Sequence, residues 1–121
     1  VSYYHWLRGQ SFDHPAVALA QTLSFADFLR HDHTVASLRS WPYPRYLTDA
    51  TGQERAAHFI HLEKLSADLG PVEQHLGFSL DVPHENRSDR QDYRAYYDAA
   101  LADHLGQVCA ADIARFGYRF D

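Results

Sequence analysis

Apolar residues recur along much of the chain at spacings of three and four positions, which is the pattern of amphipathic helices. Near the start, this pattern predicts a helix over residues 1–8 that ends at Gly9. A second short helix is predicted to open at His14-Pro15, because proline suits the first turn of a helix. Ser24 is the predicted cap of a third helix.

Residues 40–52 interrupt this helical pattern. Pro42 and Pro44 lack the amide hydrogens that the interior of a helix requires. Asp49 and Gly52 are residue types that favour turns. The segment is therefore predicted to be irregular, with turns toward its end.

The clearest candidate strand is the run AHFIHLE, residues 57–63. It is short and apolar, and its adjacent Phe59 and Ile60 suggest that both faces are covered, as in a parallel sheet. A single strand cannot satisfy its own backbone hydrogen bonds. We therefore expect an α/β fold in which this segment is mainly helical with one clear strand, and in which the partner strands belong to a larger domain.

Helices return in the second half of the chain. One is predicted to begin at Pro71 and to end at Gly77, and the longest spans residues 98–116, with Gly117 as a left-handed stop. The apolar stripe of the longest helix consists of Leu101, Leu105, Val108, Cys109, Ile113 and Phe116.

Basic and polar residues gather between these two helices. Ser88 and Gln91 fit the capping-box pattern of a helix start, which is a sufficient structural interpretation by itself. A helix start also attracts anions, and Arg87, Arg90 and Asn86 beside the cap can donate hydrogen bonds to a phosphate. The same helix is predicted to carry Tyr93, Tyr96 and Tyr97.

Composition limits the classes of function. The 121 residues suit one domain or part of one, and 45% hydrophobic with 22% charged residues is typical of a folded protein. A net charge of −5 argues against a general nucleic-acid binder, although a local basic pocket remains compatible with it.

Cys109 is the only cysteine, so the chain forms no internal disulfide, and we expect a cytoplasmic protein in which this side chain is a small buried apolar group. No run approaches the ~20 apolar residues that a membrane span needs. The chain opens at Val1 already inside a helical pattern, from which we expect a preceding segment.

The sequence favours neither a metal site nor the active site of a hydrolase. Nine histidines invite a metal site, but His31 and His33 lie two positions apart on a helix, and His58 and His61 would point to opposite faces of a strand. No G-x-S-x-G elbow of a hydrolase occurs. We expect core and packing roles, or alternatively the wall of an acceptor site, for the aromatic residues Tyr3, Tyr4, Trp6, Trp41, Tyr43 and Tyr46.

Four stretches together resemble the C-terminal half of sulfotransferases that use 3′-phosphoadenosine 5′-phosphosulfate (PAPS), in the branch that holds the carbohydrate sulfotransferases and many bacterial relatives. They are VSYYHWL, FIHLEKLSADLGPVEQHLGF, HENRS followed by YRAYY, and DIARFGYRF, and they occur in the order found in that family. The resemblance implies that residues 1–121 are the C-terminal part of a single sulfotransferase domain with a P-loop-like α/β fold.

The resemblance also implies roles for individual residues. Ser2 corresponds to the serine that holds the 3′-phosphate of PAPS. Arg87 and Ser88 correspond to a late loop that approaches the same phosphate, and Asn86 and Arg90 adjoin it. Glu63 corresponds to a structural acidic position at the end of a strand. The acceptor would be a small molecule or a carbohydrate with a hydroxyl or amine group.

The chain departs from the family pattern in one important respect. The glycine-rich, lysine-bearing loop for the 5′-phosphosulfate does not occur in residues 1–121. The catalytic base of the family is likewise expected in the segment before residue 1. This segment alone is therefore expected to be inactive and to expose apolar surface through which it can form a homodimer. The competing hypothesis is a helical protein-interaction module without enzymatic activity.

Overall fold

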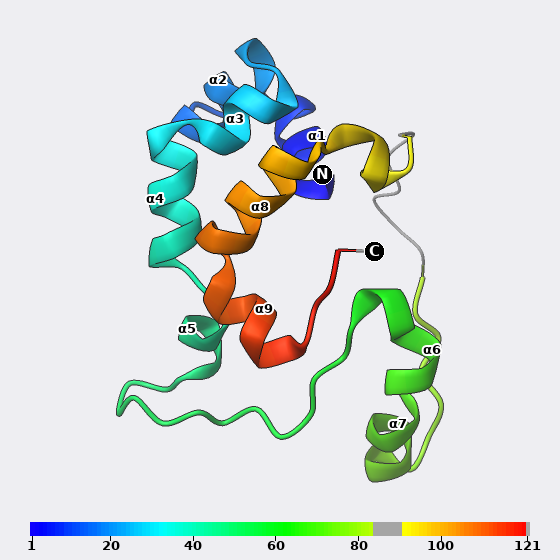
Figure 1. Ribbon diagram of the computed structural model, residues 1–121. Coiled ribbons are helices and arrows are strands. Elements are labelled where there is room, and N and C mark those ends of the chain that lie inside the picture. The colour runs from blue at the N-terminus through cyan, green and yellow to red at the C-terminus, as the bar shows by residue number, and fades with distance from the viewer. Residues whose placement is uncertain (84–90, 121) are drawn as a thin grey trace. The chain divides into compact units, whose positions relative to one another are not determined.

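The computed structural model describes residues 1–83 and 91–120, which are called the described residues below. The chain divides into two compact units. Residues 1–46 and 88–121 form the first, here called the helical unit, and residues 47–87 form the second, here called the inserted unit. The helical unit is therefore assembled from both ends of the chain, as the blue to cyan and orange to red ribbons of Figure 1 show.

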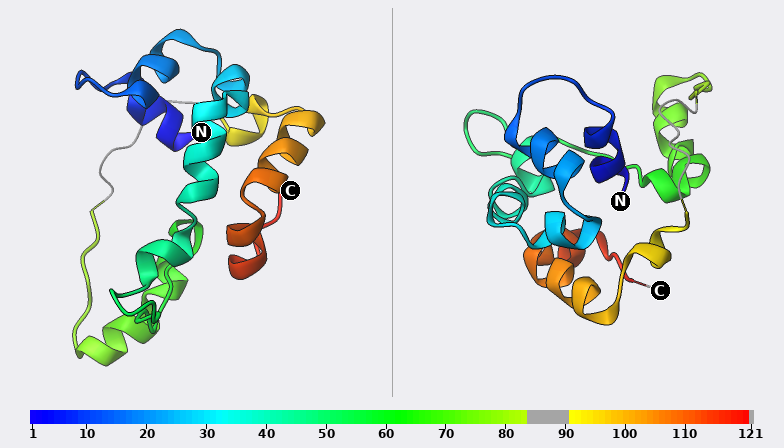
Figure 2. Two further views of the ribbon diagram at one scale, coloured as in Figure 1. Left: turned by 90° about the vertical axis from the view of Figure 1, so that its left-hand side faces the viewer. Right: turned by 90° about the horizontal axis from the view of Figure 1, so that it is seen from above.

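The helical unit contains most of the regular structure. Its elements are α1 (Ser2–Arg8), α2 (Pro15–Thr22), α3 (Phe25–Arg30), α4 (Asp32–Ser40), η2 (Tyr93–Tyr96), α8 (Ala99–Val108) and α9 (Ala110–Phe116). A short helix, α5 (Tyr43–Leu47), lies at the boundary between the two units. Within the helical unit α1 packs on α2, and α8 packs beside both α3 and α4 (Figure 2).

The core of the helical unit forms where these helices meet. Phe28, Leu7 and Leu101 are its largest fully buried side chains, with only 1–2% of their surface exposed. Complete burial of such a side chain stabilises the fold by about 1.5–3 kcal/mol. The other members of this core cluster are Tyr4, Ala16, Val17, Ala20, Phe25 and Leu29.

A hydrogen-bonded clasp joins α1 to α2 beside this core. The Tyr4 hydroxyl donates to the Leu23 carbonyl oxygen over 2.8 Å. Arg8 Nη1 donates to the Tyr4 hydroxyl over 2.9 Å and to the Ala20 carbonyl oxygen over 3.3 Å. The polar end of the buried Tyr4 is thus satisfied, as burial of a phenol requires.

Several predicted helix ends are confirmed. Ser24 Oγ accepts a hydrogen bond from the Asp27 amide over 3.1 Å at the start of α3. Asp98 Oδ1 accepts from the Leu101 amide over 2.6 Å at the start of α8. Gly117 ends α9 in the left-handed region with φ of 68°, where glycine has no steric cost.

The prediction of one long helix over residues 98–116 is wrong. The chain breaks at Cys109, with φ of −101° and ψ of 20°, between α8 and α9. Beyond the break, Asp112 Oδ1 accepts a hydrogen bond from the Tyr43 amide over 2.9 Å. This contact spans 69 positions, so no local pattern of apolar residues could have indicated it.

The prediction that residues 40–52 are irregular is also partly wrong. α5 forms within this segment even though Pro44 belongs to it. Pro44 lies in the first turn of the helix, where no intrahelical amide hydrogen bond is made, and proline is accepted there.

The inserted unit contains η1 (Leu62–Lys64), α6 (Leu65–Asp68) and α7 (Gly70–Leu76). Gly77 ends α7 in the left-handed region with φ of 78°, as predicted. Asp68 Oδ2 accepts hydrogen bonds from the His61 amide over 2.8 Å and from its ring Nδ1 over 2.7 Å. This double contact fixes the chain where it enters η1.

The predicted α/β fold with one clear strand is wrong for this segment. Residues 57–61 have no regular secondary structure, and η1 starts at Leu62. The described residues form no sheet, and their only strand-like pairing is the isolated bridge between Thr48 and Glu54. No strand pairing joins this apolar run to another described segment, and its Phe59 is 37% exposed. The segment is mostly helical.

A tight turn follows the boundary between the units. Asp49 Oδ1 accepts from the Thr51 hydroxyl over 2.6 Å, from the Thr51 amide over 2.8 Å and from the Gln53 amide over 3.1 Å. Its Oδ2 accepts from Arg55 Nε over 2.7 Å. Gly52 adopts φ of 78° in this turn, so the turn predicted from Asp49 and Gly52 is confirmed.

None of the helices that the described residues form has the length and apolar character to cross a membrane.

Two leucines provide a matched test of the core. Leu101 is 1% exposed, and Leu62 is 80% exposed. Leu101→Ala is expected to lower the free energy of unfolding by about 2–5 kcal/mol, because it removes buried methyl groups and leaves a cavity. Leu62→Ala is expected to change it by less than about 0.5 kcal/mol. Denaturant unfolding followed by circular dichroism measures both, and equal losses would contradict the packing described.

The Asp49 turn is expected to open in acid. Its hydrogen bonds, above all from the Thr51 hydroxyl and then from Arg55, lower the pKa of Asp49 from 3.8 to about 2. A lowered pKa means that the stabilisation is present above the unfolded value and is lost as pH falls through the folded one. NMR titration of the Thr51 and Gln53 amides should show a midpoint near 2 that Asp49→Asn abolishes. A midpoint near 3.8 would show that the contacts do not hold the carboxylate.

Candidate functional site

Ser2, the first residue of the predicted phosphate site, begins α1. Its side chain is exposed, and no hydrogen bond from it to another described residue is found. α1 itself is held in place by the buried Tyr4 and Leu7 and by the Arg8 clasp. Ser2 is therefore an accessible hydroxyl on a well-anchored helix.

The other four predicted site residues, Asn86, Arg87, Ser88 and Arg90, lie outside the described residues. What can be described is the backbone that follows them. Gln91 and Asp92, which the capping-box prediction places in the first turn of a helix, are not helical. The short helix η2 begins later, where Asp92 Oδ1 accepts a hydrogen bond from the Arg94 amide over 2.9 Å. The predicted placement of Gln91 in the first turn of a helix is therefore wrong.

Aromatic contacts attach this late segment to the helix that carries Ser2. The ring of Tyr96 meets the ring of His5 edge to face, with centroids 5.3 Å apart. Phe25 of α3 contacts Tyr96 at 5.5 Å and Tyr97 at 5.3 Å. His5 lies three residues after Ser2, on the same side of α1. The late segment thus reaches α1 one turn from Ser2.

Three acidic residues in or beside the four stretches accept backbone hydrogen bonds. Asp98 caps α8, Asp112 accepts from the Tyr43 amide, and Glu73 Oε1 accepts from the Leu80 amide over 2.7 Å. Glu63 lies in the first turn of η1 and is exposed. The strand at whose end Glu63 was expected does not form, so the structural setting predicted for Glu63 is wrong.

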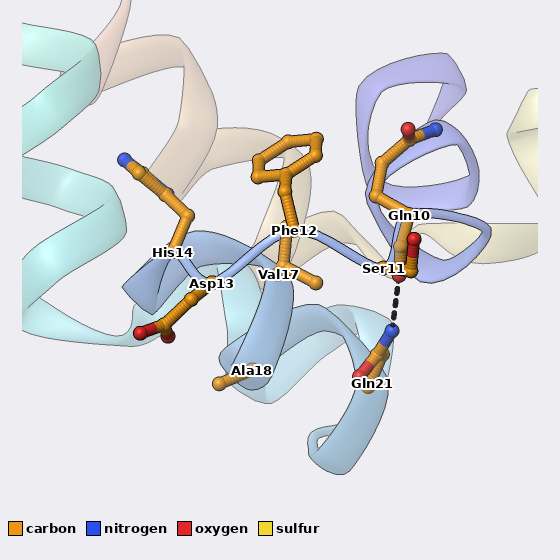
Figure 3. Close-up of a pocket in the computed structure, with 8 residues that line it drawn as sticks. All are labelled: Gln10, Ser11, Phe12, Asp13, His14, Val17, Ala18 and Gln21. Carbon is orange, nitrogen blue, oxygen red and sulfur yellow. Dashed lines mark hydrogen bonds between the residues drawn. The ribbon is translucent and has the colours of Figure 1, made fainter.

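A shallow hollow of about 170 Å³ lies between α2 and the loop before it (Figure 3). Asp13 and Gln21 extend on the same side of the loop, with Ala18 between them, while the ring of Phe12 stands on the other side. Gln21 Nε2 donates to the Gln10 carbonyl oxygen over 2.8 Å and closes one end. The sequence interpretation did not identify this hollow, and Ser2 is not among its lining residues.

The predicted aromatic set divides in the structure. Tyr4 is buried in the core, as expected for a packing role. The other five side chains are 48–66% exposed, so the expectation of core positions is wrong for them: Tyr3, Trp6, Trp41, Tyr43 and Tyr46. Tyr3 and Trp6 stack with nearly parallel rings whose centroids lie 6.2 Å apart. Partial burial, and to a smaller extent the nearby Tyr46 phenol, raises the pKa of Tyr3.

Cys109 is half-buried at the junction of α8 and α9. It borders a second hollow of about 250 Å³ together with Leu38, Pro42 and Asp112. Burial, and to a smaller extent the charge of Asp112, raises the pKa of the Cys109 thiol above its usual value. A raised pKa keeps the sulfur protonated at neutral pH, which is the state of an unreactive cysteine.

Histidine side chains in the described part of the chain contact backbone atoms of other residues. His14 Nδ1 and His31 Nδ1 each accept a backbone hydrogen bond at a helix start, and His104 Nε2 lies 3.2 Å from the Leu29 carbonyl oxygen. Residues 1–83 and 91–120 contain no group of three or more side chains placed to bind a metal ion. The helix-capping role of histidine was not predicted, although the His14-Pro15 dipeptide marked the right position.

Compared with known protein families, with curated proteins and with solved structures, the chain matches none of them.

The reactivity of the Cys109 thiol tests its burial at the junction of α8 and α9. Because burial and Asp112 raise the pKa of Cys109, its alkylation at neutral pH is expected to be several-fold slower in the folded chain than in the chain unfolded in urea. Stopped-time alkylation followed by mass spectrometry measures both rates. Asp112→Asn should accelerate the folded-state reaction. Equal rates in folded and unfolded protein would contradict the burial described.

Proposed function

We propose that this chain is the C-terminal part of a PAPS-dependent sulfotransferase and that it contributes to binding the 3′-phosphate of the cofactor. The proposal rests first on four sequence stretches that occur in the order of that family, at residues 1–7, 59–78, 84–97 and 112–120. Each stretch is loose by itself. Their common order over nearly the whole chain is the more specific signal.

The observation that carries the proposal is the contact between His5 and Tyr96. The two proposed phosphate-binding segments lie more than 80 positions apart in the sequence, one at Ser2 and the other just before Gln91. A shared site requires these ends to approach one another. The 5.3 Å ring contact one turn from Ser2 is what such a site would need, and it therefore supports the proposal.

The proposed ligand fits the chemistry of these residues. A 3′-phosphate is a compact anion with several acceptor oxygens, and a guanidinium such as that of Arg87 can donate two parallel hydrogen bonds to it. The hydroxyls of Ser2 and Ser88 would add single donors, the Asn86 amide would add a further neutral donor, and Arg90 would add a second positive charge. In a chain of net charge −5, such a local group of donors is the part suited to an anion.

The proposed parent enzyme would transfer a sulfuryl group in line from PAPS to the hydroxyl or amine of a small molecule or carbohydrate. The bond from sulfur to the leaving phosphate oxygen breaks, the bond to the acceptor forms, and a base takes the acceptor proton. In this chain Asp98, Asp112 and Glu73 already accept backbone hydrogen bonds. Its proposed part is therefore to hold the nucleotide, and exposed rings such as Trp6 suit the acceptor side.

A second candidate function is a helical module that binds another protein or a second copy of itself. The exposed aromatic side chains at α5 favour it: Trp41 is 51% exposed, Tyr43 63% and Tyr46 66%. Aromatic residues are more frequent at protein interfaces than on the rest of a protein surface. Its single cysteine, Cys109, agrees with either function in the cytoplasm.

The two functions predict different behaviour toward a nucleotide. Adenosine 3′,5′-bisphosphate is expected to bind the full-length protein, and Arg87→Ala is expected to weaken binding by about 1–3 kcal/mol, the range for a hydrogen bond to a charged group. Ser2→Ala should lower the affinity less, because its hydroxyl is neutral. Isothermal titration calorimetry measures the three affinities.

The matched control is Arg30→Ala, which removes an exposed arginine from the last turn of α3. This variant tests whether a loss of nucleotide affinity follows from the lower net positive charge of the chain or from the location of the arginine that is removed. Equal weakening by Arg30→Ala and Arg87→Ala would remove the late loop from the site. Absence of nucleotide binding to the full-length protein would favour the interaction module.

A further inference from the structure

Three aromatic side chains with more than half of their surface exposed gather at α5, namely Trp41, Tyr43 and Tyr46. Ring centroids lie 5.8 Å apart between Trp41 and Tyr46 and 6.4 Å apart between Tyr43 and Tyr46. Tyr43 also meets Phe116 of the neighbouring α9 edge to face at 6.1 Å (Figure 1). At roughly 200 Å² for each ring, the three exposed side chains leave about 350 Å² of aromatic surface in water, which is the size of a functional patch.

Two arginines are held against these rings. The guanidinium carbon of Arg45 lies 4.1 Å from the centroid of the Trp41 ring, and its Nη1 donates to the last carbonyl oxygen of α4 over 3.0 Å. The guanidinium carbon of Arg115 lies 5.6 Å from the centroid of the Phe116 ring. Such contacts restrict the arginine side chains before any ligand arrives, so less conformational entropy is lost when they bind one.

The hollow of about 250 Å³ beside Cys109 continues this surface. Pro42, which stands between Trp41 and Tyr43 in the chain, belongs to its lining together with Leu38 and the buried Val108. A third exposed arginine, Arg39, borders it as well. An apolar cavity of about 150 Å³ accepts a benzene ring, so this hollow has room for one large apolar side chain.

The charges of this surface favour an acidic occupant. Residues 39–46 and 99–116, which form the surface and the adjoining α8, contain three arginines and two aspartates in a chain of net charge −5. Each arginine lies in the last turn of its helix and there offsets the negative end of the helix dipole, but that role does not require exposed aromatic rings beside it. In a symmetric dimer the same arginines would face one another, so charge favours an acidic partner over a second copy.

We propose that the rings of Trp41, Tyr43 and Tyr46, the three arginines and the hollow form a docking site, here called the α5 face, for an acidic peptide segment of another protein. The segment carries one large apolar side chain, which fills the hollow, and its carboxylates pair with the arginines. Tryptophan, tyrosine and arginine are the residue types that most often dominate the binding energy of protein interfaces. The proposal rests on the second candidate function and not on nucleotide binding.

The two tryptophans of the chain provide an internal control, because Trp41 is 51% exposed and Trp6, on α1, is 48% exposed. The full chain is titrated with a short synthetic peptide of aspartates and glutamates around one central phenylalanine, up to about 5 mM, a concentration that detects even weak recognition. Nitrogen–hydrogen correlation NMR spectra resolve both indole groups. The indole of Trp41 and the amide of Ala111, in the lining of the hollow, should shift with peptide, and the indole of Trp6 should not.

Matched peptides and variants separate the parts of the site. A peptide with serine in place of phenylalanine should bind at least about fivefold more weakly, because it leaves the hollow unfilled. A peptide with lysines in place of the acidic residues should not bind. Arg45→Gln should weaken binding about three- to tenfold, because it removes a charge-assisted pair. Arg30→Gln, which removes an exposed arginine from the end of α3, should leave the affinity unchanged.

Several results would overturn the proposal. They are equal shifts of the two indoles, equal losses in Arg30→Gln and Arg45→Gln, or no shift of Trp41 at the highest peptide concentration. Tighter binding of a thymidine oligonucleotide or of phosphatidylserine vesicles would assign the α5 face to a nucleic acid or a membrane, and a dimer that Trp41→Ala dissociates would assign it to a second copy. Each of these assignments excludes the acidic peptide.

The result is also distinguishable from a test of the sulfotransferase proposal. A full-length protein that binds the peptide at Trp41 but does not bind adenosine 3′,5′-bisphosphate would support the docking site and contradict the nucleotide site. Binding of the nucleotide without any shift of Trp41 in the peptide titration would do the opposite.

Discussion

The packing of Leu101 against the first three helices is the interaction on which the helical unit depends. Leu101 comes from the last part of the sequence and is 1% exposed in a cluster whose other members all precede residue 30. It is the one fully buried member of this cluster that comes from the second half of the described chain, and the partly buried Leu105 packs against the cluster beside it. Tyr96 and Tyr97, beside α8, extend the same contact to Phe25 and His5.

Because the core joins distant parts of the chain, the sequence predicts the local features of the fold better than the long-range ones. Helix ends are local, so Ser24, Gly77 and Gly117 could be identified from residue type and position alone. The strand over residues 57–63 could not be decided in that way, because an apolar run becomes a strand only when another backbone lies beside it. The break at Cys109 likewise lies close to a contact between Asp112 and the distant Tyr43. The spacing of apolar residues in the helix gives no indication of that contact.

For the candidate site, too, the sequence indicates individual residues but not which distant segments lie together. The sequence resemblance names Ser2 and Arg87, which belong to segments far apart in the chain, but spacing cannot say whether such segments meet. The described contact of Tyr96 with His5 is long-range, and it is the kind of information that only a three-dimensional structure supplies. Conversely, the exposure of Trp41 and Tyr46 could not be read from their type, because aromatic residues are common both in cores and at binding surfaces.

The start of α2 adds a constraint on how α1 can present Ser2. A cap is needed there because the first amides of any helix lack internal partners. His14 meets that need, since its Nδ1 accepts a hydrogen bond from the Ala16 amide over 3.1 Å. Tyr4 and Arg8 of α1 donate hydrogen bonds to carbonyl oxygens at the far end of α2. The helix that carries Ser2 is therefore held by a helix whose own start depends on the His14 cap.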